Sequence, residues 1–258
     1  MSARVIVHRD KTTLAAAVAA RLVTTITDVQ AEHGEAHVVL TGGSMGNALV
    51  EALVDSPAAP AVAWELVHLW WGDERYVERE SADRNATQAR EAGLARMAAL
   101  GLDPANVHEL PATDDAEGDD IAAAAERYAA ELARVAAGSG RRGPHGVDVP
   151  AFDVVMLGVG PDAHVASLFP GKATLDVTDR TVVPETDSPK PPPARLSLTM
   201  PALCTADEVW LLVAGEDKAE AVAAATGGAD VHEAPAAGVR GRRRTLWLVD
   251  EAAAGDLP

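Results

Sequence analysis

Residues 152–171, FDVVMLGVGPDAHVASLFPG, decide the fold that we predict for this chain of 258 residues. The mostly apolar run from Phe152 to Leu157 predicts a buried strand. A glycine-rich turn follows it and presents His164, and a short helical turn then ends at Pro170-Gly171. A strand that ends in a glycine turn carrying a polar residue is typical of an open α/β sheet, which places its chemistry at the carboxyl ends of its strands.

Strands and helices alternate along the rest of the chain. The patterns predict strands near residues 4–8, 36–40, 66–75, 181–184, 194–199, 208–215 and 245–250, and helices near 11–30, 47–53, 84–97, 116–136 and after Lys218. Such alternation predicts a doubly wound, largely parallel, Rossmann-like sheet with helices on both faces. Residues 138–150 form a predicted flexible loop. Because the alternation continues on both sides of it, we expect a single domain over residues 1–258.

The composition excludes several classes of function. A formal net charge of −17 disfavours nucleic acid as a partner, although a small anionic substrate stays compatible with a local group of Arg and Lys. We find no long apolar run and no apolar leader, so neither a membrane span nor a secretion signal is expected. The single cysteine, Cys204, excludes an intramolecular disulfide framework, and we expect a cytoplasmic location. No grouping of ligand residues predicts a metal centre.

The segment Thr41-Gly42-Gly43-Ser44 lies between a predicted strand and a predicted helix. It can bind phosphate at the helix N-terminus, or it can be a tight turn with Ser44 as the N-cap. The same segment fits the G-x-S-x-G elbow of serine hydrolases, in which Ser44 would act with Asp153 and His164. Only about two predicted strands precede this elbow, and no His-Gly-Gly loop lies upstream, which disfavours the hydrolase.

The central turn also fits a dinucleotide fingerprint, Gly158-x-Gly160-x-x-Ala163, with Asp179 about 20 residues further on. The context does not fit, because Pro170-Gly171 ends the helix too soon and Asp179 precedes the next strand instead of ending it. We therefore expect no NAD site.

The polar residues at the strand ends have simple structural interpretations and sharper chemical ones. His164 could be a surface or capping residue, but Asp162 beside it could orient its imidazole for general base catalysis. The run Trp71 to Arg75, WGDER, could be a solvated ion pair, and the proline-rich Ser188–Pro193 could be a linker. Prolines also pre-order a loop so that it can hold a basic side chain in place.

These stretches together closely resemble the 6-phosphogluconolactonase family. Residues 152–171 are similar to its D-x-x-x-L-G-x-G-x-D-G-H-x-A-S-L-F-P-G signature, and residues 41–44 resemble its T-G-G-S phosphate loop. WGDER and the later Asn85 match a further motif, and residues 188–199 resemble P-K-P-P-x-R-[IL]-[ST]-[LF]-T. The matches follow the order of the family from residue 41 to the C-terminal stretch. The chain departs from the pattern at Met45-Gly46, Glu78 and Ala163.

The resemblance implies hydrolysis of 6-phospho-D-glucono-1,5-lactone to 6-phospho-D-gluconate without a cofactor or a metal. It implies that His164, supported by Asp162, is the general base. The residues that it assigns to binding of the substrate and its phosphate are Thr41, Gly42, Gly43, Ser44, Asp73, Arg75, Lys190, Arg195 and Lys218. The expected partner is a sugar-phosphate lactone, and the expected state is a monomer or a small homo-oligomer.

Two alternatives come from the same fold. Glucosamine-6-phosphate deaminases share the G-x-D-G-H turn but continue it with an acidic F-N-E-P segment, where this chain has Ser167-Leu168-Phe169-Pro170. A sugar-phosphate-binding protein that has lost catalysis would keep the phosphate residues. The intact His164 and Asp162 count against this second alternative.

Overall fold

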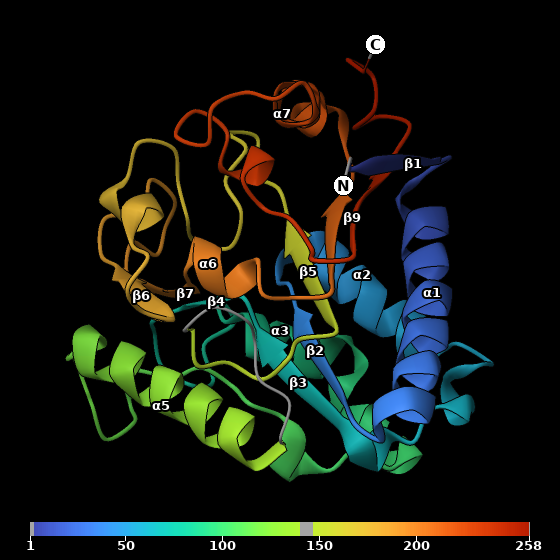
Figure 1. The fold of residues 1–258 in the computed structure, drawn as a ribbon, viewed down its shortest axis with the longest axis vertical. Coiled ribbons are helices and arrows are strands. Elements are labelled where there is room, and N and C mark those ends of the chain that lie inside the picture. Colours follow the sequence, from blue (N-terminus) through green and yellow to red (C-terminus); the bar gives the residue numbers. More distant parts are fainter. Residues whose placement is uncertain (1–2, 140–146, 258) are drawn as a thin grey trace.

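A parallel β-sheet forms the centre of the molecule. The computed structural model describes residues 3–139 and 147–257. Its six-stranded sheet has the order β1-β9-β8-β5-β2-β3, and all of its neighbouring strands are parallel (Figure 1). The strands are β1 (Arg4–His8), β2 (Ala36–Leu40), β3 (Val67–Trp71), β5 (Val154–Gly158), β8 (Glu208–Val213) and β9 (Arg244–Asp250). Strands that precede residues 138–150 in the sequence and strands that follow them belong to this one sheet. The predicted α/β class is confirmed.

Helices flank this sheet. Figure 1 shows α1 on one side of the sheet and α5 on the other. The α-helices are α1 (Lys11–His33), α2 (Gly43–Val54), α3 (Asn85–Ala89), α4 (Ala95–Met97), α5 (Ile121–Ser139), α6 (Met200–Leu203) and α7 (Ala219–Thr226). Parallel neighbouring strands need such crossovers, because each strand must return to the same end of the sheet before the next begins.

Helix α1 shows how the sequence forms these elements. The side chain of Asp10 caps it by accepting a hydrogen bond from the backbone N–H of Thr13, and Gly34, with a positive φ, ends it. Its buried stripe follows the helical repeat: Leu14, Val18, Leu22 and Ile26. Among the described residues α1 is also long and apolar enough to cross a membrane, which is weak evidence, because a helix packed on a sheet passes the same test.

A second, antiparallel sheet was not predicted. It consists of β4 (Asp73–Arg75), β7 (Arg195–Leu198) and β6 (Val182–Glu185), in the order β4-β7-β6. The predicted strand at 66–75 divides at Gly72, so that β3 joins the parallel sheet and β4 joins the small one. β6 and β7, expected in the parallel sheet, pair as antiparallel neighbours because the loop between them is too short for a helical crossover.

Other local predictions also need correction. The helix predicted at 84–97 is divided by a π-helical segment, Arg90–Leu94, in which Gly93 has a φ of 143°. The helical turn expected before Pro170 is a set of turns instead. The helix predicted from residue 116 begins at Ile121, after acidic turns. Of the predicted loop at 138–150, residues 140–146 lie outside the described part of the chain.

Candidate active site

The predicted site residues come together at the carboxyl ends of β2, β5 and β8, next to β4 and β7. A cavity of about 390 Å³ lies there. All of them line it except Asp162, which lies behind His164: Thr41, Gly42, Gly43, Ser44, Asp73, Arg75, His164, Lys190, Arg195 and Lys218. Residues that are far apart in the sequence meet here because parallel strands end at one edge of the sheet.

His164 and Asp162 form a hydrogen-bonded pair. Nδ1 of His164 lies 2.5 Å from Oδ1 of Asp162. Because an ionised carboxylate only accepts hydrogen bonds, Nδ1 carries the proton and Nε2 keeps its lone pair. The ring packs against Phe169, with its centroid 4.6 Å away. The imidazole is therefore oriented as a proton acceptor at the cavity wall.

Gly160 makes room for this imidazole. A Cβ atom at position 160 would lie 2.0 Å from Nδ1 of His164 and 2.4 Å from Oδ1 of Asp162. The glycine turn after β5 is thus required by the close approach of the catalytic pair, and a side chain at this position would displace it. Ala163, by contrast, adopts a left-handed φ of 59°, a conformation that glycine adopts with less strain.

Asp162 stays ionised in this environment. Partial burial opposes its ionisation, but the hydrogen bond from Nδ1–H of His164 and the charge of Lys190 outweigh that effect. Together they hold the pKa of Asp162 well below its usual range. The carboxylate therefore accepts the hydrogen bond from Nδ1–H in its ionised form.

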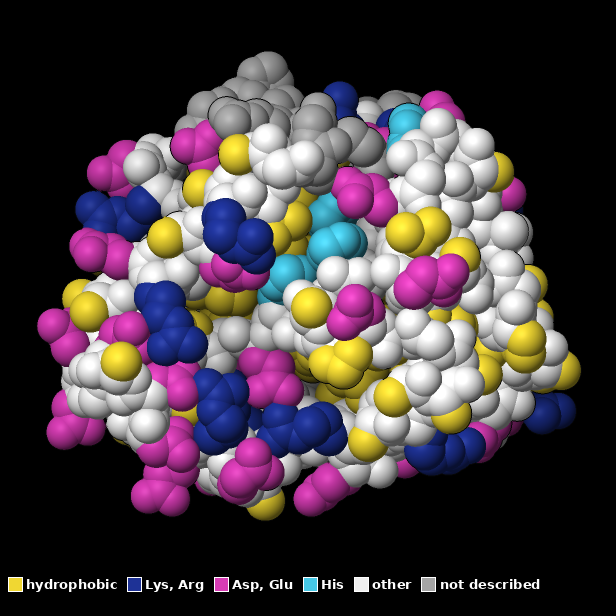
Figure 2. Space-filling view, turned by 90° about the horizontal axis from the view of Figure 1, so that it is seen from below, with side chains coloured by type: hydrophobic (Ala, Val, Ile, Leu, Met, Phe, Trp, Pro, Cys, Tyr) yellow, Lys and Arg dark blue, Asp and Glu magenta, His cyan; other side chains and the backbone are white. Residues whose placement is uncertain are grey.

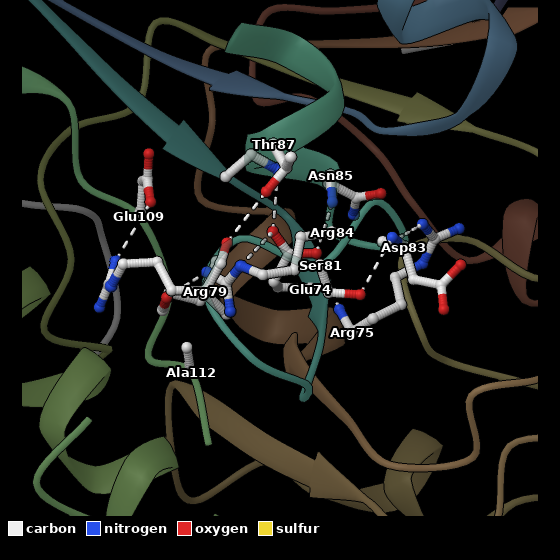
Figure 3. Close-up of polar contacts among 12 residues, drawn as sticks. Glu74, Arg75, Arg79, Ser81, Asp83, Arg84, Asn85, Thr87, Glu109 and Ala112 are labelled. Carbon is white, nitrogen blue, oxygen red and sulfur yellow. Dashed lines mark hydrogen bonds and ion pairs between the residues drawn. The ribbon is translucent and has the colours of Figure 1, made fainter. Parts of the chain in front are cut away.

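Glu74 organises the strand that carries Asp73 and Arg75. It is completely buried, and its carboxylate accepts hydrogen bonds from the backbone N–H groups of Arg75 (2.9 Å), Asn85 (2.7 Å) and Ala86 (2.9 Å). Figure 3 shows it between Arg75, Arg84 and Asn85, and Nε of the buried Arg84 lies 3.8 Å from Oε2. Burial raises the pKa of Glu74 against the opposing effects of Arg84 and the backbone donors. The residue fixes the backbone of two cavity-lining residues.

Asn85 is a cavity-lining residue to which the sequence analysis assigned no role. Its Nδ2 donates to the backbone oxygen of Asp73 at 2.9 Å, and a Cβ at Gly42 would lie 1.8 Å from its Oδ1. Asn85 thus donates to β4 and packs closely against the turn after β2. Its position after WGDER in a family motif was the signal that could have identified it.

Ser44 does not have the partners of a serine nucleophile. Ser44 and His164 both lie in the described part of the chain, and no hydrogen bond joins them. Ser44 is also not the N-cap, because α2 begins at Gly43 after Gly42 and has no side-chain cap. The first N–H groups of α2 have no intrahelical acceptor, so this end of the helix can receive an anion.

The cations around the cavity differ in how they are held. Arg75 donates through Nη1 to the backbone oxygen of Asp83 at 2.5 Å, and Lys218 contacts Asp217 at 2.6 Å. Arg195 is buried, and its Nε and Nη2 donate to backbone oxygens of residues 190–192. Arg75 and Lys218 both line the cavity, Lys218 paired with the exposed Asp217, whereas most donors of Arg195 are used inside the protein.

A cluster of histidines lies at the opposite, amino-terminal end of the strands. Figure 2 shows histidine side chains gathered in a hollow on this face. Among the described residues, Glu35, His37 and His68 have potential metal-ligand atoms within 4.8 Å of one another. Their spacing along the chain did not predict this group, because the pairing of β2 with β3 brings His37 beside His68.

The hydrogen bonds of this cluster fit a metal ion poorly. Trp70 Nε1 donates to Nδ1 of His37 at 3.3 Å, so Nε2 of the neutral ring carries the proton and faces Glu35 at 3.4 Å. A metal at Nε2 would move that proton to Nδ1, where it would face the indole N–H. The described contacts of His37 are therefore those of a hydrogen-bonded core histidine.

Comparison with known proteins identifies the family. The model of a family described as glucosamine-6-phosphate isomerases/6-phosphogluconolactonase matches residues 9–247. The chain belongs to this family. It is 53% identical over 255 residues to the 6-phosphogluconolactonase of Streptomyces coelicolor, covering 99% of this chain and 95% of that protein. It is 46% identical to the 6-phosphogluconolactonase of Mycobacterium tuberculosis over 258 residues, 100% of both chains.

Solved structures of the family share the fold. The 6-phosphogluconolactonase of Trypanosoma brucei superposes with a TM-score of 0.83 at 27% identity, covering 100% of this chain and 99% of that one. A monomeric glucosamine-6-phosphate deaminase superposes with a TM-score of 0.74 at 18% identity, over 98% and 99% of the two chains. The fold is therefore common to both activities, and the residues of the site must distinguish them.

Proposed function

We propose that this protein hydrolyses 6-phospho-D-glucono-1,5-lactone to 6-phospho-D-gluconate. The observation that carries the proposal is the Asp162–His164 pair, whose Nε2 is a proton acceptor in a cavity that also contains Arg75, Lys218 and the N-terminus of α2. A base and several cations around one cavity suit a small anionic ester. The sequence similarity to curated lactonases supports the same reaction.

His164 is the general base of this mechanism. Its Nε2 removes a proton from a water molecule as the water oxygen attacks C1 of the lactone, and Asp162 stabilises the imidazolium that forms. When the tetrahedral intermediate collapses, the bond between C1 and the ring oxygen breaks, and the imidazolium returns the proton to that oxygen. A positioned base of this kind accelerates a reaction by about 10²–10⁴-fold.

The turn at residues 42–44, to which the resemblance assigns the phosphate, also offers backbone N–H groups to the oxyanion. The other glycine turn considered from the sequence is less suitable, because the N–H of Gly158 already donates to Oγ1 of Thr41 and the N–H of Gly160 to the backbone oxygen of His164. The first N–H groups of α2 have no such partner within the helix, and the helix dipole adds positive potential there.

Turnover of freshly prepared 6-phosphogluconolactone, corrected for spontaneous hydrolysis, tests the proposal. Wild type should accelerate hydrolysis, and His164→Ala should lose about 10²-fold or more of the rate while still binding 6-phosphogluconate in calorimetry. Glucosamine 6-phosphate serves as the control substrate. Wild-type turnover no faster than buffer would overturn the activity, whereas an active His164→Ala variant would overturn only the assignment of the base.

A further inference from the structure

Lys190 lies beside the catalytic pair. Its Nζ is 3.4 Å from Oδ1 of Asp162 and 3.4 Å from Nδ1 of His164. The same carboxylate oxygen thus lies between an imidazole and an ammonium group. The family resemblance implies that Lys190 is one of the residues that bind the substrate and its phosphate. In the structure, Lys190 lines the cavity and its ammonium group also contacts the catalytic pair.

The loop that carries Lys190 is held by Arg195. Nη2 of Arg195 donates to the backbone oxygens of Lys190 (3.1 Å) and Pro191 (3.2 Å), and Nε donates to that of Pro192 (3.1 Å). Ser188 adds a hydrogen bond from its Oγ to the backbone oxygen of Lys190 at 2.9 Å. The backbone of Lys190 is therefore fixed from two sides.

The two neighbours of the imidazole have opposite effects on its protonation. The Asp162 carboxylate favours the imidazolium, whereas an ammonium at 3.4 Å opposes a second positive charge. Other charged groups also line the cavity, from β4, β7 and the turn before α7: Asp73, Arg75, Arg195 and Lys218. With Asp162 alone, the base would take up a proton from solvent more readily, and a protonated imidazole cannot accept one from water.

We propose that Lys190 is a positioning residue that keeps His164 unprotonated before the reaction, and that Arg195 holds Lys190 in place for this purpose. The inference deepens the proposed function and rests on it, because it assigns a role to Lys190 in the same lactone hydrolysis. Lys190 thus controls the fraction of enzyme that has a working base, and it does not act as a phosphate ligand.

The variant Lys190→Met tests this role, because it removes the charge and keeps most of the aliphatic stem. Without the ammonium, the acidic limb of kcat/KM against pH should move to higher pH by about one unit. The variant should therefore lose activity near neutral pH and regain it in alkaline buffer, with KM little changed there. Lys190→Arg, which keeps the charge, should restore most of the wild-type profile.

Lys172→Met is the matched control. Lys172 lies outside the cavity and pairs with the exposed Asp187 at 2.6 Å, so its removal should leave the profile unchanged. A higher KM for Lys190→Met at every pH, with the acidic limb unmoved, would overturn the proposal and make Lys190 a phosphate ligand.

Nuclear magnetic resonance separates this inference from the proposed function. The ¹⁵N shifts of His164 report its protonation without any substrate, and the midpoint of this titration should be higher in Lys190→Met than in wild type. If wild type fails to hydrolyse the lactone, the proposed function is wrong, yet this titration still tests Lys190. An unchanged midpoint would overturn the role of Lys190 even in an active enzyme.

Discussion

The absence of a Cβ atom at Gly160 determines where the imidazole of His164 can lie. At position 160 a methyl group would occupy the space in which the imidazole of His164 lies, because a Cβ there would be 2.0 Å from Nδ1. We predict that Gly160→Ala lowers kcat by about 10²-fold, the effect of displacing a reacting group by about 1 Å. Steady-state kinetics on the lactone measure the change. A variant with wild-type kcat would show that the ring does not need this space.

Gly138→Ala provides a control at the same scale. Gly138 lies near the end of α5, its φ is not in the left-handed region, and a Cβ there meets nothing within 4 Å. The kcat of the Gly138→Ala variant should equal that of wild type. The comparison separates the close approach at Gly160 from a general effect of replacing glycine.

At the scale of elements, β4 and α3 are joined through one buried carboxylate. Glu74→Gln replaces an acceptor of three backbone N–H groups with an amide and leaves the buried Arg84 without its counter-charge. We predict that the free energy of unfolding falls by about 3 kcal/mol. KM should also rise, because Arg75 and Asn85 lose their fixed backbone. Urea denaturation and kinetics measure the two effects.

Glu80→Gln is the matched control for this element. Glu80 is 79% exposed and pairs with Arg90 at the surface, so its replacement should change the free energy of unfolding by less than about 0.5 kcal/mol. An equal decrease in the free energy of unfolding in Glu74→Gln and Glu80→Gln would contradict the structural role of Glu74.

At the scale of the whole molecule, a buried histidine makes stability depend on pH. His108 stacks on Trp70 with centroids 3.8 Å apart, and burial, followed by the charge of His68, lowers the pKa of His108 to about 4. The unfolded chain binds a proton at this histidine near its usual pKa of about 6.5. Between these two values the unfolded state binds more protons, so stability falls as the pH falls. We predict a loss of about 2 kcal/mol between about pH 7 and about pH 4.5.

Urea denaturation at a series of pH values measures this loss. His108→Gln, which cannot be protonated, should show a shallower dependence, whereas the half-exposed His232→Gln should keep the wild-type slope. The same slope in His108→Gln as in wild type would assign the acid sensitivity to other groups.

The sequence by itself determined the parallel sheet and the identity of the residues around the cavity. Strand and helix patterns are local, and parallel strands bring their carboxyl ends to one edge, so the order of residues alone places His164 and Thr41 together. The motif resemblance extended this prediction to Arg75, Lys190 and Lys218. The resemblance did not predict which polar group each of these cationic side chains contacts.

Only the tertiary structure decided the contacts that depend on residues far apart in the chain. The antiparallel sheet arises because the loop between β6 and β7 is too short for a crossover, which a pattern of apolar residues does not reveal. Lys190 reaches Asp162 because Arg195 holds its loop. His37 meets His68 through the register of β2 with β3. Side-chain direction follows from packing in three dimensions, and local sequence patterns do not contain it.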